Sequence, residues 1–145
     1  MEIIICDSDN VNAGKIKDIC FQYSFQWEEE SEIKIINARE EMYSYMKASN
    51  LTSLIIAETA IVKGEMISEK LKEQFVLVMG HTPEELLNLV SPSFRPAGLL
   101  VKPVKKEKLE HLLSEVWKEY KKAQTRENML SLIHISEPTR LLSIS

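Results

Sequence analysis

Five short apolar runs alternate along the chain with longer segments in which apolar residues recur every three or four positions. The runs lie at residues 2–6, 33–38, 51–57, 76–79 and 99–101. The first and third contain continuous stretches of isoleucine and other apolar residues, as is typical of strands buried on both faces. Strands that alternate with helices predict right-handed crossovers and a parallel sheet with helices on both sides. We therefore expect a three-layer, doubly wound α/β domain with a five-stranded parallel sheet.

The segments between and after these runs predict helices. Four of them carry apolar residues at helical spacing, at positions 16–23, 42–46, 66–71 and 109–120. The remaining helix is expected to begin at Thr82, because this capping residue is followed by proline in the first turn and then by two glutamates.

The five strand–helix units occupy residues 1–122, which we expect to form one domain. Residues 123–129 are predicted to be the end of the last helix and a connector. Residues 130–145 lack a clear period and include Pro138, so they predict a disordered or non-native tail. Residues 131–140 resemble peptides obtained by translating sequencing-adapter reads at the ends of metagenomic gene models. We therefore expect the natural C-terminal segment, with an output domain, to be missing.

Composition narrows the possible functions. The 18 basic and 22 acidic residues give a net charge of −4, which does not favour wrapping around a polyanion. The two cysteines, Cys6 and Cys20, have no paired framework or metal-ligand spacing and are expected to be reduced core thiols. No apolar stretch approaches the roughly 20 residues of a membrane span, and the chain enters a strand without a signal sequence. We expect a cytoplasmic protein without membrane partners.

Charged residues follow three of the predicted strands. Asp7 and Asp9 come after the first, Glu58 after the third, and Lys102 with Pro103 after the fifth. In an open parallel sheet, the carboxyl ends of the strands share one edge, where ligands bind. We therefore expect three carboxylates and one ammonium group in a single cleft. An ammonium group among carboxylates favours their charged forms without needing a metal.

Simpler interpretations of these acids stay open. An acid at the end of a strand is often a helix cap or a turn residue, and this applies to Asp9. Glu58 equally fits an exposed loop. The joint pattern favours the cleft, because topology brings the strand ends together, but it does not require a reaction there.

Five strand–helix units, with acids after strands one and three and Lys-Pro after strand five, resemble the receiver (CheY-like) domain of two-component response regulators. The resemblance covers residues 1 to 122 and implies a flavodoxin-like fold with strand order 2-1-3-4-5. Segments 3–7 and 94–103 are most similar to receivers that precede a LytTR-type DNA-binding domain. Such a domain would begin near residue 129.

The resemblance also assigns roles to the cleft residues. In the family, an aspartate after strand three accepts a phosphoryl group from a histidine kinase, and it holds Mg²⁺ together with the acids after strand one. Glu58 stands at the acceptor position. Its longer side chain displaces the carboxylate, and such misplacement can cost about a hundredfold in rate. Ser8 stands where an acid usually binds the metal. We expect no metal or other cofactor, with Asp7, Asp9 and Glu58 as weak Mg²⁺ candidates.

Two further positions depart from the family pattern, and one segment agrees with it. Met79 replaces the hydroxyl residue that contacts the phosphoryl group, and Leu99 replaces the aromatic switch residue. Lys102 matches the family lysine. The resemblance implies that the bond between Lys102 and Pro103 is cis.

These residues predict a degenerate receiver domain that acts in signal transduction and transcription control as an interaction module, not as an enzyme. Its carboxylate at Glu58 would imitate the charge of a phosphorylated aspartate. The alternative is a phosphorylatable, Mg²⁺-dependent receiver. A flavodoxin-like carrier or enzyme is a weaker alternative, because residues 7–10 lack the glycines of a phosphate cradle.

Partners are expected from the family as well. They are a histidine kinase or another signalling protein, and a second copy of the chain. The second copy would bind through the helix that begins at Thr82, the strand at 99–101 and the final helix. DNA would be bound only through the missing C-terminal domain.

Overall fold

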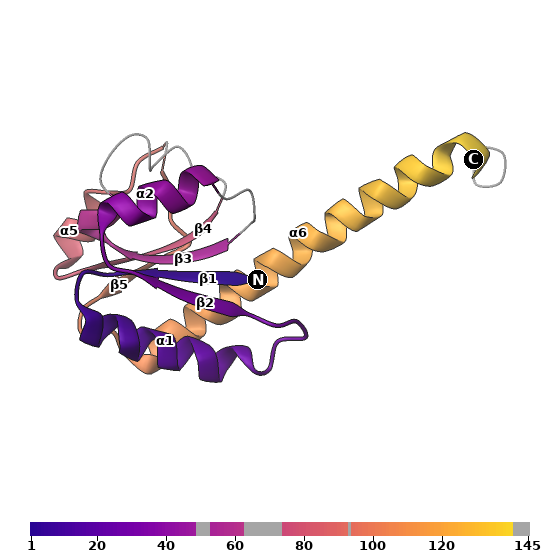
Figure 1. The fold of residues 1–145 in the computed structure, drawn as a ribbon. Coiled ribbons are helices and arrows are strands. Elements are labelled where there is room, and N and C mark those ends of the chain that lie inside the picture. Colours follow the sequence, from indigo (N-terminus) through magenta and orange to yellow (C-terminus); the bar gives the residue numbers. More distant parts are fainter. Residues whose placement is uncertain (49–52, 63–73, 93, 141–145) are drawn as a thin grey trace. The chain divides into compact units, whose positions relative to one another are not determined.

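The computed structural model of this chain describes residues 1–48, 53–62, 74–92 and 94–140. Strands and helices alternate along these residues (Figure 1). The elements are β1 Glu2–Cys6, α1 Asn10–Ser24, β2 Glu32–Ile36, α2 Arg39–Ala48, β3 Ser53–Glu58, α3 Thr59–Val62, β4 Phe75–Gly80, α5 Pro83–Leu87, β5 Gly98–Val101 and α6 Lys106–Arg140. The chain forms two compact units, residues 1–113 and 114–145, and α6 contributes to both.

The strands form one parallel sheet in the order β2-β1-β3-β4-β5. This confirms the predicted fold class and strand order. Ile3 and Ile4 in β1 and Ile55 and Ile56 in β3 are completely buried, as their continuous hydrophobicity predicts. The edge strand β2 instead alternates between exposed and partly buried residues until its last residue, Ile36, which is buried.

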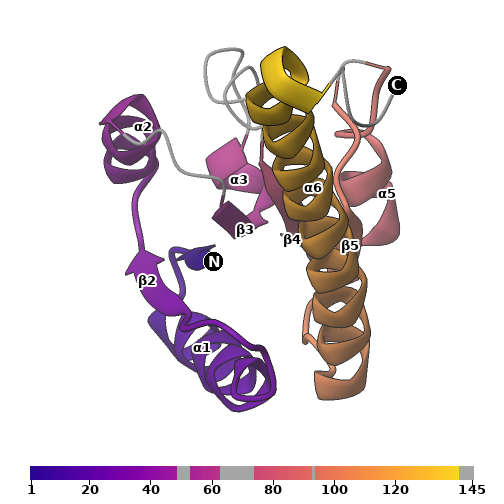
Figure 2. The same cartoon turned by 90° about the vertical axis from the view of Figure 1, so that its right-hand side faces the viewer.

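Helices cover both faces of the sheet, with α1 on one side and α2 and α5 on the other (Figures 1 and 2). One face packs with α2, α3 and α5 into a buried apolar cluster, which contains Ile4, Cys6, Ile36, Met42, Met46, Ile55, Ala57, Ile61, Val62, Val76, Val78, Leu86 and Phe94. Adjacent strand residues point to opposite faces. Ile3 and Ile56 therefore face the other layer, to which α1 contributes Ile16 and Cys20.

The structure corrects one element boundary and leaves one predicted helix untested. Ala38 was predicted to belong to the second strand, but β2 ends at Ile36. The amide of Asp7 donates to the Ile36 carbonyl, and the Asn37 side chain then donates to the Asp7 carbonyl in place of a further strand bond. The helix predicted at 66–71 lies outside the described residues. The described helix of this region, α3, follows β3 directly.

The ends of two helices can be compared with the sequence predictions. Thr82 caps α5 by accepting from the Glu85 amide, as predicted, with Pro83 in the first turn. The last helix, α6, continues to Arg140, beyond the predicted end at 129. In a helix, proline lacks a backbone donor and its ring crowds the carbonyl four residues earlier, so the position of Pro138 predicted an end of the helix before the one that the structure shows.

The described cysteines agree with the predicted core thiols. Cys6 and Cys20 are both free and buried. Burial raises the pKa of each thiol to about 12. At Cys6 the neighbouring carboxylates of Glu58, Asp7 and Glu41 add to the effect of burial. Neither thiol is therefore an activated nucleophile at neutral pH. Among the described residues, no helix is long and apolar enough to cross a membrane.

Candidate functional site

The site begins in the loop between β1 and α1. Asp9 caps α1, because its Oδ1 accepts from the backbone amides of Val11 and Asn12 at 3.0 and 3.3 Å. Its carboxylate is thus committed to the helix, which agrees with the simpler interpretation of this residue. Among the described residues, Asp9 forms no hydrogen bond or ion pair with Glu58 or Lys102 and does not join their cluster.

Asp7 is the buried anion of the site, with an exposed fraction of 0%. Its Oδ1 accepts from the Asp9 amide at 2.9 Å, and its Oδ2 accepts from Asn12 Nδ2 at 2.5 Å. Burial by itself would raise the pKa of Asp7. The hydrogen bonds from Asp9, Asn12 and Lys102, together with the Lys102 charge, outweigh burial and hold this pKa below its ordinary value. Asp7 is therefore ionised at neutral pH.

Glu58 ends β3, and both its oxygens are engaged. Oε1 accepts from the backbone amide of Ser8 at 2.9 Å, and Oε2 lies 3.4 Å from Lys102 Nζ. The side chain is 12% exposed. Glu58 thus ties the end of β3 to the loop after β1.

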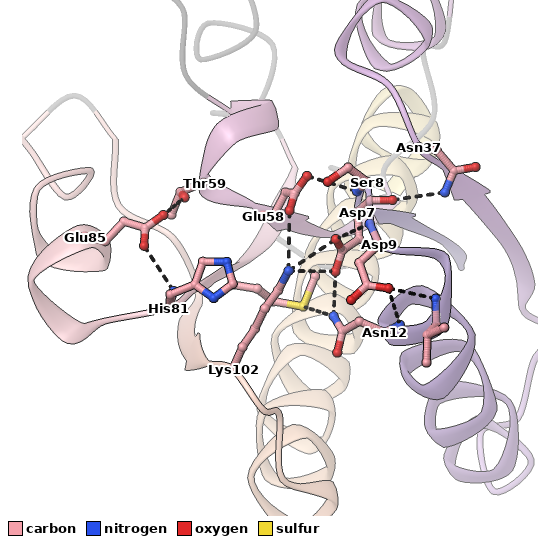
Figure 3. Close-up of polar contacts among 12 residues, drawn as sticks. Asp7, Ser8, Asp9, Asn12, Asn37, Glu58, Thr59, His81, Glu85 and Lys102 are labelled. Carbon is pink, nitrogen blue, oxygen red and sulfur yellow. Dashed lines mark hydrogen bonds and ion pairs between the residues drawn. The ribbon is translucent and has the colours of Figure 1, made fainter.

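Lys102 follows β5 and supplies the cation. Its amide donates to the Gly80 carbonyl at 2.8 Å, and its bond to Pro103 is cis. Its Nζ lies 3.0 Å from Asp7 Oδ2 and 3.2 Å from Asp7 Oδ1 (Figure 3). Burial alone would lower the pKa of Lys102, but Asp7 and Glu58 raise it above its ordinary value. One ammonium group is therefore shared by two carboxylates.

Two polar side chains at this edge were missed by the sequence interpretation. Asn12 donates to Asp7 and also lies 3.8 Å from Met79 Sδ. Thr59 is buried and donates its hydroxyl to Glu85 Oε1, while Glu85 Oε2 accepts from the His81 amide at 3.1 Å. The position of Asn12 in the first turn after a capping aspartate was the available signal for the first contact. No comparable signal marks Thr59.

The two positions that the resemblance compares with receiver switch residues, 79 and 99, hold apolar side chains. Met79 is completely buried, with its sulfur beside Asn12. Leu99 is partly buried and packs against the apolar cluster beneath α2 and α5. Neither side chain carries a hydroxyl group that could donate a hydrogen bond to an anion in the cleft.

The acids of this site do not fit Mg²⁺, which needs several oxygen ligands in near-octahedral geometry. Lys102 already bridges Asp7 and Glu58, and Asp9 caps α1. Throughout the part of the chain that the structure describes, no group of three or more histidine, cysteine, aspartate or glutamate residues is placed to hold a metal.

Comparisons with known proteins reveal similarity in structure only. No family model matches the sequence, and no curated protein matches it. A similar solved structure is the N-terminal domain of a response regulator/sensory box/GGDEF three-domain protein from Carboxydothermus hydrogenoformans. It has 14% identity and a TM-score of 0.65, and the alignment covers 85% of this chain and 98% of that one.

Two further structures are similar over most of their length. The signal receiver domain of a histidine kinase from Clostridium thermocellum has 17% identity and a TM-score of 0.60, with 79% of this chain and 95% of that chain covered. The receiver domain of the sensor histidine kinase PA1611 from Pseudomonas aeruginosa, solved with magnesium in its active-site cleft, has 10% identity and a TM-score of 0.60, with the same two coverages. These likenesses establish the fold, which is the CheY-like fold of receiver domains.

Proposed function

We propose that this chain is a receiver-type signalling module that acts through partner binding and not through phosphorylation or enzymatic turnover. The observation that carries the proposal is the placement of Lys102 Nζ, 3.0 Å from Asp7 and 3.4 Å from Glu58, in a cleft whose acceptor position is a glutamate. The module would bind its partners with Asp7, Glu58 and Lys102 charged and without a phosphoryl group.

The contacts of Glu58 argue against its use as a nucleophile. Its oxygens are held by the Ser8 amide and by Lys102, so attack on a donor would require that one of these bonds be broken. The carboxylates of Asp7 and Glu58 and the ammonium group of Lys102 together carry a net charge of one negative unit. This charge opposes the approach of an anionic phosphoryl donor. The permanent negative charge of Glu58 beside Lys102 would imitate the charge of a phosphorylated aspartate.

The exposed apolar side chains near β5 support a protein partner. The side chain of Leu87 at the end of α5 is 62% exposed. Val90, in the segment after α5, is 41% exposed, and Val101 at the end of β5 is 43% exposed. We propose that this surface, with the part of α6 that belongs to the same unit (residues 106–113), binds a second copy of the chain, and that a histidine kinase or another signalling protein is the upstream partner. A LytTR-type output domain following the receiver would supply DNA binding and transcription control.

Intact-mass measurement after incubation with acetyl phosphate and Mg²⁺ tests the proposal. We expect no phosphoryl adduct on the wild-type chain. The double variant Ser8→Asp/Glu58→Asp restores both missing aspartates and serves as the control for the donor, so we expect it to gain a base-labile adduct.

An adduct on the wild type that disappears in Glu58→Gln would contradict the proposal. It would instead support the alternative of a phosphorylatable, Mg²⁺-dependent receiver.

A second prediction concerns the contact between Glu58 and the Ser8 amide. Glu58→Asp shortens the side chain by about 1.5 Å, one carbon–carbon bond. The carboxylate then loses the Ser8 amide, and a hydrogen bond to a charged group contributes about 1.5–3 kcal/mol. Hydrogen exchange at Ser8 should accelerate about tenfold or more, because local opening becomes easier. Glu58→Gln is the matched control, since it keeps the length and an acceptor oxygen. Equal exchange rates in both variants would refute this contact.

A further inference from the structure

We propose that the outer face of the last turn of α1 binds a basic amphipathic helix of a partner protein. This surface, called the α1-end surface below, consists of Phe21 and Phe25 together with Glu28 and Glu30 in the loop that follows. It is separate from the surface near β5 that is assigned above to a second copy of the chain. It also shares no residue with the cleft.

The two phenylalanines form an apolar patch in contact with solvent. Phe21 is 55% exposed and Phe25 is 73% exposed. Their rings meet edge to face, with the centroids 4.8 Å apart. Single exposed apolar side chains are ordinary, whereas adjoining ones mark sites of interaction, and aromatic residues are enriched in protein interfaces. The pair therefore offers a contact for the apolar side of a partner.

The turn that carries this surface is held by buried groups. Trp27 is buried, and its ring meets that of Tyr23 edge to face, with the centroids 6.3 Å apart. The amino group of Met1 donates to the Glu30 carbonyl at 3.3 Å and lies 3.4 Å from Glu29 Oε1. A surface that is already ordered loses little conformational entropy when a partner binds. The phenylalanine rings and the flanking carboxylates are therefore presented in a fixed arrangement.

The charge beside the rings is negative and selects the partner. Glu28 and Glu30 are exposed, and in the part of the chain that the structure describes neither forms an ion pair. Asp18, one turn before Phe21, is also exposed, and the adjacent Lys17 offsets only one of these three acids. Complementary charge favours a partner with lysine or arginine, and like charge opposes an acidic one. The net charge of −4 likewise disfavours a second copy of this chain as the occupant.

A helix fits the shape of this surface. Phe21 and Phe25 are four residues apart, and Phe25 keeps helical backbone angles at the end of α1, so both lie on one face. Side-chain ridges of this kind pack into the grooves of a neighbouring helix. An amphipathic partner helix would place apolar side chains on the rings and basic ones beside Glu28 and Glu30.

The α1-end surface lies far from the cleft. The helix begins at Asn10, next to the cleft, and its 1.5 Å rise per residue places Phe21 about 16 Å further along. Figure 1 shows that α1 ends on the side of the sheet where β1 begins. A partner bound here would leave Asp7, Glu58 and Lys102 uncovered, so failure of this inference and failure of the proposed function are distinguishable.

NMR titration of the isotope-labelled full chain tests the inference. The probe is a synthetic amphipathic helix of leucine and lysine, and the same peptide with glutamate in place of each lysine is its counterpart. The proteins are the wild type, Phe21→Ser/Phe25→Ser, Glu28→Gln/Glu30→Gln and the control Val11→Ser, which alters an exposed apolar side chain at the other end of α1.

We expect the leucine–lysine peptide to shift the amide signals of residues 21–30 in the wild type and in Val11→Ser with equal affinity. The phenylalanine double variant should bind about tenfold more weakly, as is usual when aromatic contacts at the centre of an interface are lost. The glutamine double variant and added NaCl should each weaken binding, because both reduce the attraction between charges. The leucine–glutamate peptide should cause no shift.

Three outcomes would overturn the inference. One is equal affinity of the phenylalanine double variant and the wild type, and another is a set of shifts centred outside residues 21–30 or absent altogether. The third is a shift of the same signals with rising concentration of the protein alone, which would make a second copy the occupant. If the phenylalanine double variant does not fold, the glutamine double variant decides, and wild-type affinity in that variant overturns the inference.

Discussion

Replacement of Asp7 by alanine is expected to lower the free energy of unfolding by about 3 kcal/mol, the lower end of the range for breaking a buried ion pair. Asp7 is completely buried, and its removal leaves Asn12 Nδ2 and the Asp9 amide without their acceptor. Lys102 also loses the nearer of its two acids. Urea unfolding at neutral pH measures the change. Asp18→Ala, on the exposed side of α1, is the control and should cost little.

The acid dependence of stability provides an independent check on Asp7. Its pKa is lowered in the folded protein from an ordinary value of 3.8. The unfolded state therefore binds this proton first as the pH falls. The stabilisation by Asp7 is present above pH 3.8 and is lost as the pH falls through the lower folded pKa. Asp7→Asn should remove this part of the pH dependence. An unchanged slope below about pH 4 would show that Asp7 is not held by these contacts.

Replacement of Ile55 by alanine is expected to cost about 3–4 kcal/mol, the usual range for a large-to-small change in a core. Ile55 is completely buried at the centre of β3 and belongs to the cluster shared with α2, α3 and α5. The same strand carries Glu58, so its packing also positions the cleft. Chemical denaturation measures the loss. Ile55→Val keeps most of the side chain and should cost only about 1 kcal/mol. Similar small costs for both variants would contradict the burial of this position.

Most of the fold could be predicted from the sequence, because apolar strand segments, helical spacing and helix caps depend mainly on neighbouring residues in the chain. The continuous apolar stretches of β1, β3 and β4 are typical of strands buried on both faces. Strands of this kind that alternate with helices pack as a parallel sheet. Thr82 and Pro83 likewise predict the start of α5 from local backbone chemistry. Boundaries were less predictable, since the end of β2 at Ile36 depends on the side-chain contacts of Asn37.

The sequence by itself also determined that Asp7, Glu58 and Lys102 would share a sheet edge, because parallel strands end on the same side. Only the tertiary structure decided what each group does there. It turned Asp9 into the cap of α1, brought Asn12 onto Asp7, and let Glu58 reach the Ser8 amide. These outcomes depend on distances of a few ångströms between groups far apart in the chain, and residue spacing carries no information about such distances. The balance of charge in the cleft is therefore a property of the folded chain.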